Sequence, residues 1–107
     1  MADVTVKRTE EFEPTFRGGM LKVRAGLGVT SFGIQMLRFP PNFETPPHSH
    51  DHSEVFVVLE GSCVFDGAPM GRHDSTVVEA NDKYGFTTGP DGVELLVVRT
   101  GAAAVSM

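Results

Sequence analysis

The sequence has little positive charge, a single tyrosine, no tryptophan and no long hydrophobic run. Nine Lys and Arg residues stand against fourteen Asp and Glu, which gives a formal net charge of −5. No stretch concentrates Lys or Arg, so we expect neither nucleic acid nor anionic membrane surfaces as partners. No apolar stretch approaches the length of a membrane span, and the first residues lack the basic and apolar regions of a secretory signal.

Cysteine is almost absent as well. The one cysteine, Cys63, cannot form an internal disulfide. This usage is typical of a reducing compartment, so we expect a cytoplasmic protein. Residues 63–65 read Cys-Val-Phe, a short apolar pattern that favours a strand. We therefore expect Cys63 to be a small buried side chain rather than a reactive one.

No helical period is visible, and every candidate element is short. Twelve Gly and seven Pro are spread over 107 residues, and the interior segments between them are rich in Val, Thr and Phe. This pattern predicts one all-β domain over residues 1–107, with N-terminal strands in 1–30 and a sandwich or barrel in 31–107. The predicted strands are 4–7, 20–25, 31–39, 53–59, 62–65, 76–79, 84–87 and 93–99, with a hairpin turn at Asp66-Gly67.

The segment 55–59, Val-Phe-Val-Val-Leu, is apolar on both faces. A strand with one face in water alternates apolar and polar residues, so this strand is expected to be covered on both sides. The N-terminal segment or a second subunit could supply the cover. We expect a homodimer.

Three histidines and a glutamate, His48, His50, His52 and Glu54, stand two residues apart. Side chains at this spacing point to the same face of an extended chain. Imidazoles and a carboxylate that converge in this way favour a site for a borderline divalent metal. A solvated polar loop is the alternative that spacing alone leaves open.

This segment resembles the first motif of the cupin family, which reads Gly, five residues, His-x-His, three or four residues, Glu, six residues, Gly. His48, His50, Glu54 and Gly61 stand at these intervals, and Asn42 stands where the leading Gly belongs. Asn tolerates left-handed backbone better than most residues. The resemblance implies a double-stranded β-helix (jelly-roll) barrel in which His48, His50 and Glu54 bind a divalent ion such as Fe, Mn, Zn, Ni or Co.

The family's second motif reads Gly, five residues, Pro-x-Gly, two residues, His, three residues, Asn. Asp74 and the Val77-Val78 pair set its register here, and no motif position is identical. The two motif regions cover residues 42–61 and 73–88. The five motif positions of the second region hold His73, Glu79, Asn81, Tyr84 and Thr88.

Tyr84 therefore occupies the position of the family's fourth metal ligand, a His. A bound cation can lower the pKa of a phenol enough to make it a phenolate ligand. The phenol can instead stay neutral and act as a proton donor beside an open three-ligand site. In the third interpretation it only fills the space of the missing His. We expect an active-site role, and Tyr84 is our candidate catalytic residue.

Other polar residues have two interpretations each. On a straight strand His52 would be a ligand, whereas the family resemblance implies a bend that leaves it on the surface or behind the ligands. His73 is expected in a solvated turn. Arg38 and Gln35 fall on opposite faces of one strand, so either can point inward; an inward Arg38 could hold a substrate carboxylate, but a surface position is more typical.

Two His and one carboxylate resemble the facial arrangement of non-haem iron sites. The resemblance implies a metal-dependent enzyme acting on a small oxygen-rich carbonyl or carboxylate compound, by oxygenase, isomerase/cyclase or lyase chemistry. A non-catalytic ligand-binding or accessory cupin is the alternative, favoured by the degenerate second motif. A protein in which the metal is purely structural is the third. Cupins host all of these functions, so the fold does not choose among them.

Overall fold

The computed structural model describes residues 13–14, 21–24, 33–99 and 105–106. Every regular element in these ranges is a strand, so the predicted all-β class is confirmed. None of the described residues forms a helix that is long and apolar enough to cross a membrane. The predicted strand 4–7 lies outside the described residues. The strands are β1 (Glu13–Pro14), β2 (Leu21–Arg24), β3 (Gly33–Phe39), β4 (Ser49–His50), β5 (Glu54–Phe65), β6 (Ala68–Met70), β7 (Ser75–Val78), β8 (Phe86–Arg99) and β9 (Val105–Ser106).

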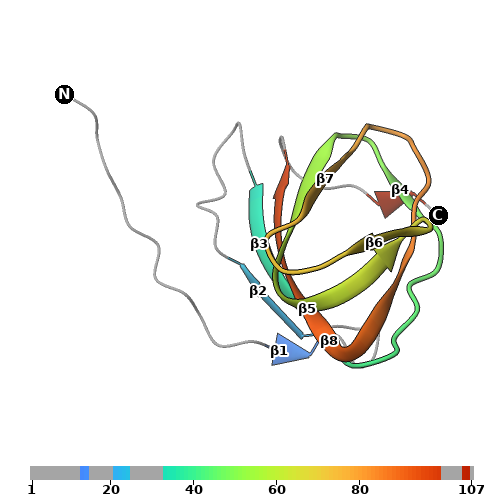
Figure 1. Cartoon of the computed structure of the whole chain (residues 1–107). Helices are drawn as coiled ribbons and strands as arrows, with labels where there is room; N and C mark the ends of the chain where they lie inside the picture. The colour runs from blue at the N-terminus through green and yellow to red at the C-terminus, as the bar shows by residue number, and fades with distance from the viewer. Residues whose placement is uncertain (1–12, 15–20, 25–32, 100–104, 107) are drawn as a thin grey trace.

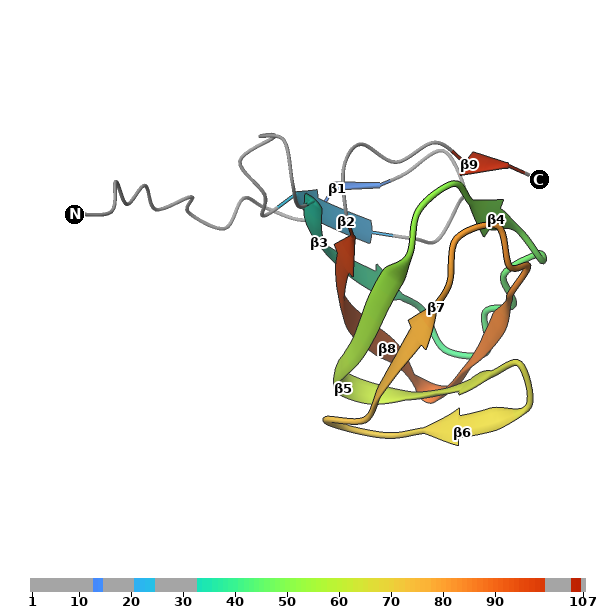
Figure 2. The same cartoon turned by 90° about the horizontal axis from the view of Figure 1, so that it is seen from above.

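The main sheet has the order β1-β2-β3-β8-β5-β6, and β7 also pairs with β5. The pairings of both sheets are antiparallel. β4 and β9 form a separate two-stranded sheet. Figure 1 shows that β5 and β8 are long and strongly curved, and Figure 2 shows β4 and β9 together on one side of the described part. This curvature wraps the strands around one interior.

β5 and β8 each join two segments that the sequence predicts as separate strands, 53–59 with 62–65 and 84–87 with 93–99. The predicted breaks are wrong because the chain bends there without leaving the sheet. The β5–β8 register shifts between Val58 and Glu60 and again between Gly61 and Cys63. A β-bulge of this kind sharpens the bend and the twist of a strand.

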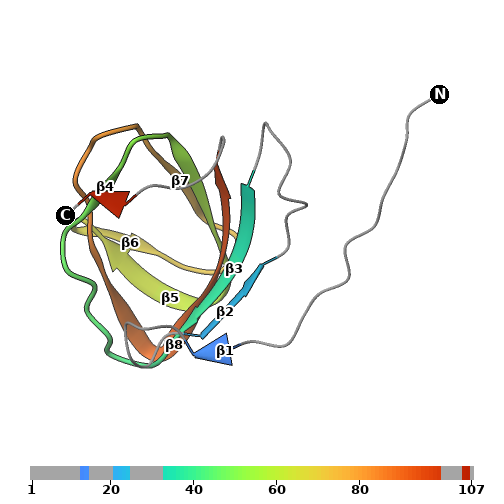
Figure 3. The same cartoon turned by 180° about the vertical axis from the view of Figure 1, so that it is seen from behind.

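The register shifts also change which residues of β5 face the interior. Before the shifts Phe56 and Val58 are buried, and after them Cys63 and Phe65 are buried. Successive residues of a strand point to opposite faces, so one extra residue in β5 exchanges the two faces. The inward residues are therefore even-numbered before the shift and odd-numbered after it. Figure 3 shows β5 and β8 curving around the same interior. Cys63 is buried, as predicted, and this burial raises the pKa of its thiol.

Left-handed backbone occurs at four positions where the family motifs place glycine. Asn42, Gly61, His73 and Asn81 have φ values of 54°, 78°, 73° and 70°. The hairpin turn predicted at Asp66-Gly67 is also present, with φ values of 46° and 85°, and two successive positive φ values are the signature of a type I′ turn. Backbone geometry therefore agrees with the motif register even where the glycine itself is replaced.

Candidate metal centre

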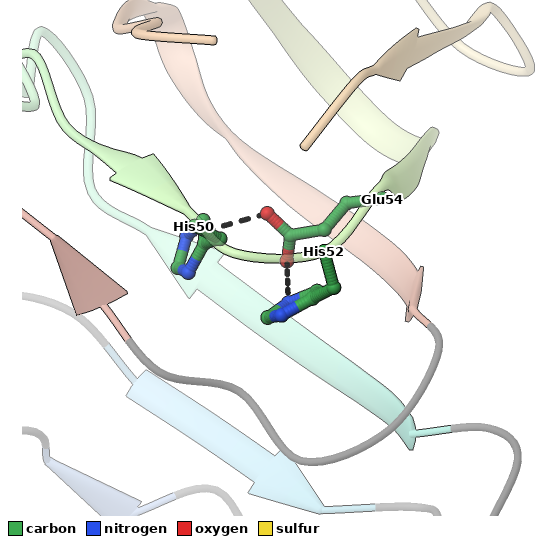
Figure 4. A group of neighbouring side chains, drawn as sticks. All are labelled: His50, His52 and Glu54. Carbon is green, nitrogen blue, oxygen red and sulfur yellow. Dashed lines mark ion pairs between the residues drawn. The ribbon is translucent and has the colours of Figure 1, made fainter. Parts of the chain in front are cut away.

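Three short segments place the predicted ligands. His50 ends β4, a bend at residues 51–52 carries His52, and Glu54 begins β5. Glu54 is fixed on both sides, because it pairs with Val78 of β7 and with Arg99 of β8. Figure 4 shows the side chains of His50 and His52 turned toward the Glu54 carboxylate.

One ligand atom from each of His50, His52 and Glu54 lies within 4.8 Å of the others. The nitrogen His50 Nε2 lies 3.3 Å from Glu54 Oε1, and His52 Nε2 lies 3.9 Å from Glu54 Oε2 (Figure 4). All three residues are buried, with Glu54 only 3% exposed. Burying three ionisable groups is costly unless they are paired or coordinate a metal.

His52 is held in the tautomer that a metal ligand needs. Its Nδ1 lies 2.9 Å from Asp51 Oδ1, and because a carboxylate only accepts, Nδ1 must donate. In the neutral ring the lone pair is then on Nε2, which is buried and has no hydrogen-bond partner among the described residues. A carboxylate that orients a histidine in this way is the usual support of a metal-binding imidazole.

The interpretation of His52 as a surface residue is thus wrong. The bend implied by the family resemblance is present, but it turns the imidazole inward, and His52 is only 8% exposed.

The Tyr84 hydroxyl lies between His50 and Glu54. It donates a hydrogen bond to Glu54 Oε1 at 3.1 Å and lies 3.1 Å from His50 Nε2. Two backbone hydrogen bonds to His48, of 2.9 and 3.0 Å, anchor the Tyr84 main chain, and its ring stacks on Phe65 at 5.4 Å. The phenol is therefore held in one place by both its backbone and its ring.

Three of the candidate donor atoms have the spacing that a metal ion requires, and the 3.9 Å between His52 Nε2 and Glu54 Oε2 is slightly longer. His50 Nε2, Glu54 Oε1 and the Tyr84 hydroxyl are separated by 3.1, 3.1 and 3.3 Å. Nitrogen and oxygen ligands bound at about 2.0–2.2 Å lie roughly 2.9–3.5 Å apart in octahedral or tetrahedral sites. These separations are also hydrogen-bond lengths, so hydrogen bonds hold the atoms where a metal would bind them. The residues present fit a divalent ion.

His48 is not a member of the compact group. Its Nδ1 lies 3.0 Å from the carbonyl oxygen of Pro46, which only accepts, so His48 also has its lone pair on Nε2. The ring contacts its neighbours, with centroids 5.2 Å from His50 and 4.5 Å from Tyr84. The assignment of His48 as a ligand stays a prediction.

The remaining predictions concern the surroundings of the site. Arg38 is exposed and forms an ion pair of 2.7 Å with Glu94, so its surface interpretation is confirmed. His73 lies in an exposed turn, as expected. Phe56 and Val58, which share the parity of Glu54, are buried beneath it on β5.

The sequence interpretation missed Arg99, whose Nη1 lies 3.6 Å from Glu54 Oε2. A signal was present in the sequence. Val93, Leu95 and Val97 are the inward residues of β8, and position 99 continues their parity.

Comparisons with known proteins show which solved structures this fold is similar to. No family model and no curated protein matches the sequence. Among solved structures, an RmlC-like cupin from Shewanella frigidimarina NCIMB 400 is 26% identical, with a TM-score of 0.75 over 86% of this chain and 84% of that one. The polyketide cyclase RemF from Streptomyces resistomycificus is 23% identical, with a TM-score of 0.77 over 99% and 84%.

A third structure is a sugar phosphate isomerase of the cupin superfamily from Silicibacter pomeroyi DSS-3. It is 27% identical, with a TM-score of 0.63 over 78% of this chain and 60% of that one. The strand arrangement, the inward-facing His and Glu side chains and these similarities lead to one conclusion. The chain is a small domain of the cupin superfamily with the jelly-roll fold.

Proposed function

We propose that this chain is a metal-dependent enzyme that acts on a small oxygen-rich carbonyl or carboxylate compound. The observation that carries the proposal is the buried group of His50, His52 and Glu54, with the Tyr84 hydroxyl 3.1 Å from two of its ligand atoms. Two of the similar structures are named as a cyclase and an isomerase, so the same fold supports such reactions.

His50, His52 and Glu54 would hold the ion. The resemblance to the first cupin motif adds His48 as a further ligand. A divalent ion such as Fe, Mn, Zn, Ni or Co supplies Lewis acidity, and iron adds oxygen chemistry. The protein orients the donors: Asp51 fixes the His52 tautomer, and strand pairing on both sides fixes Glu54. Such orientation is what allows a site to bind metal without reorganising.

Tyr84 would act as the general acid that donates a proton to the substrate. Its hydroxyl carries one proton, at present directed to Glu54 Oε1, and it is buried with the ring fixed against Phe65. A proton donor within hydrogen-bond reach of the reacting group is the requirement for general acid catalysis. Isomerase, cyclase and lyase reactions commonly transfer a proton and would use such a group.

Metal content tests the proposal directly. Elemental analysis of wild-type protein purified without added metal is expected to give one equivalent per chain. His50→Ala is expected to retain less than about a tenth of that amount, because a ligand is lost. The matched control is His73→Asn, which removes an exposed turn histidine and keeps a residue tolerant of the positive φ of 73°. Wild-type protein that binds no metal, even after incubation with each candidate ion, would contradict the proposal.

The same measurement shows whether His48 and His52 are metal ligands. His52→Ala is expected to lower metal affinity at least about tenfold, because its buried Nε2 belongs to the compact group. If His48 is a ligand, as the motif resemblance implies, His48→Ala is also expected to lower metal affinity at least about tenfold. A His48→Ala protein with wild-type affinity would show that His52 takes the place of His48 in the ligand set.

The non-catalytic cupin differs in one measurable respect. It would bind metal and a small ligand but convert none of a panel of carbonyl and carboxylate compounds, with or without oxygen. The homodimer and the cytoplasmic location remain predictions in either case.

A further inference from the structure

Arg99 is a basic side chain inside the metal centre. Within residues 33–99 it is the only Lys or Arg with an ion-pair contact to the His50, His52 and Glu54 group. Its side chain is 13% exposed, and its position opposite Glu54 is set by the β5–β8 register. Arg38, the residue that the sequence offered for carboxylate binding, instead pairs with Glu94 at the surface.

Among the described residues, the guanidinium of Arg99 has no polar side-chain contact other than the ion pair with Glu54. Its contact with Glu54 is 3.6 Å long, which is an ion pair beyond hydrogen-bond length. The Nε atom is buried and has no hydrogen-bond partner among the described residues. A guanidinium has five N–H donors in a planar fork that matches a carboxylate, and buried donors without acceptors are costly.

We propose that Arg99 binds the carboxylate of the substrate, so that the substrate class is a small hydroxy or oxo acid. The inference rests on the proposed function, because the acid's other oxygen would be the group at the metal. Since Nη1 lies 3.6 Å from the carboxylate that supplies a metal ligand, the anionic group and the reacting oxygen must be separated by only a few bonds.

A monoanionic carboxylate fits better than a phosphate. The neighbouring Glu54 carboxylate repels a ligand's negative charge, and this repulsion is larger for a dianionic phosphate than for a monoanionic carboxylate. Of the other basic residues in 33–99, Arg72 lies at the exposed surface against Glu60, and Lys83 is exposed. A single guanidinium matches a single carboxylate in charge and shape.

The test compares glycolate with its uncharged analogue glycolamide on the full chain loaded with Zn²⁺, by titration calorimetry. The two ligands differ in charge but present similar oxygens to the metal. We measure wild type, Arg99→Gln and Arg38→Gln, because both substitutions remove one positive charge and only the first lies in the site. Inorganic phosphate is titrated in parallel as the competing anion.

Wild type and Arg38→Gln are expected to share one preference for glycolate over glycolamide. Arg99→Gln is expected to keep its Zn²⁺ and to show that preference reduced about ten- to hundredfold, which is the effect of losing a charge-assisted hydrogen bond. An unchanged preference in Arg99→Gln overturns the inference and leaves the proposed function standing. Phosphate bound more tightly than glycolate, with the same dependence on Arg99, overturns the carboxylate assignment. If wild type takes up no Zn²⁺, a candidate ion that it does bind replaces Zn²⁺ in the titrations. Wild-type protein that binds none of the candidate ions overturns the proposed function and this inference together.

If Arg99→Gln does not fold or does not hold Zn²⁺, Arg99→Lys decides. Lysine keeps the charge but cannot make two parallel hydrogen bonds to a carboxylate. The preference for glycolate is then expected to fall at least about threefold, as for the loss of one hydrogen bond. A lysine variant with the wild-type preference overturns the inference.

Discussion

Tyr84 is the residue in which this domain departs most from the family pattern, since it stands where a histidine ligand is expected. The structure brings its hydroxyl to the same point, within 3.1 Å of both His50 Nε2 and Glu54 Oε1. A phenol reaches further than an imidazole, so Tyr84 can serve the site as ligand or as proton donor. Space filling alone would not require the hydroxyl to be buried among donors.

Ferric iron distinguishes these roles. The Fe(III)-loaded protein is expected to show a visible phenolate-to-metal charge-transfer band that is absent in Tyr84→Phe, with metal affinity reduced about tenfold. Tyr84 is the only tyrosine of the chain, so the band has one source. The Phe variant keeps the ring that packs on Phe65 and should fold normally. A colourless ferric wild type, with a Phe variant equal to it in affinity and activity, would leave Tyr84 as a filler.

At the scale of elements, the curvature of β5 and β8 depends on close contact between two glycines. Gly61 has φ 78° and Gly92 has φ 74°. A Cβ atom built on Gly61 would collide with the backbone carbonyl of Gly92. The bulge therefore requires glycine for two reasons, the left-handed backbone and the absence of a side chain.

Gly61→Ala is expected to destabilise the domain more than Gly67→Ala. Both glycines have positive φ, of 78° and 85°, so both substitutions carry a backbone cost of about 1–2 kcal/mol. Only the methyl group added at residue 61 would also collide with backbone atoms, because nothing lies within 4 Å of a Cβ built on Gly67. Urea unfolding should show a loss at least about 1 kcal/mol larger for Gly61→Ala, as expected for overpacking. Equal losses would mean that the β5–β8 bend adapts without the close contact.

At the scale of the whole molecule, the outer face of β5 and β7 carries two exposed valines beside the polar Ser75. Val55 and Val77 are neighbours across these strands and are 37% and 61% exposed. An apolar strand that alternates buried and exposed valines leaves hydrophobic surface in water, which commonly marks an interface. This observation supports the predicted homodimer.

Val77→Asp is expected to convert a dimer into an 11.5 kDa monomer, because it places a charge on this outer face. Sedimentation velocity at micromolar concentration measures the change. The control is Val64→Asp, at another exposed valine, which pairs with Pro69 of β6. Wild-type protein that sediments as a monomer would contradict the prediction.

Short sequence patterns alone determined the fold class, one hairpin turn and the types of metal ligand. Alternation of apolar residues with frequent Gly and Pro indicated an all-β fold, and Asp66-Gly67 indicated a hairpin turn, because these signals depend on a few adjacent residues. The structure shows that this turn is of type I′. The spacing from His50 to Glu54 gave the metal-ligand types. The motif register placed His73 and Asn81 at glycine positions of the second motif, and the structure shows left-handed backbone at both.

The tertiary structure decided what depends on distant segments. The bend before β5 and Asp51 set the direction in which His52 turns. From the sequence, the strand pattern made His52 a ligand, whereas the family resemblance placed it on the surface or behind the ligands. Arg99 enters the site because β8 pairs with β5 in a register fixed by bulges, and no local pattern encodes that register. The sequence thus determined the types of donor in the site, and strand pairing between residues far apart in the chain determined which of them meet.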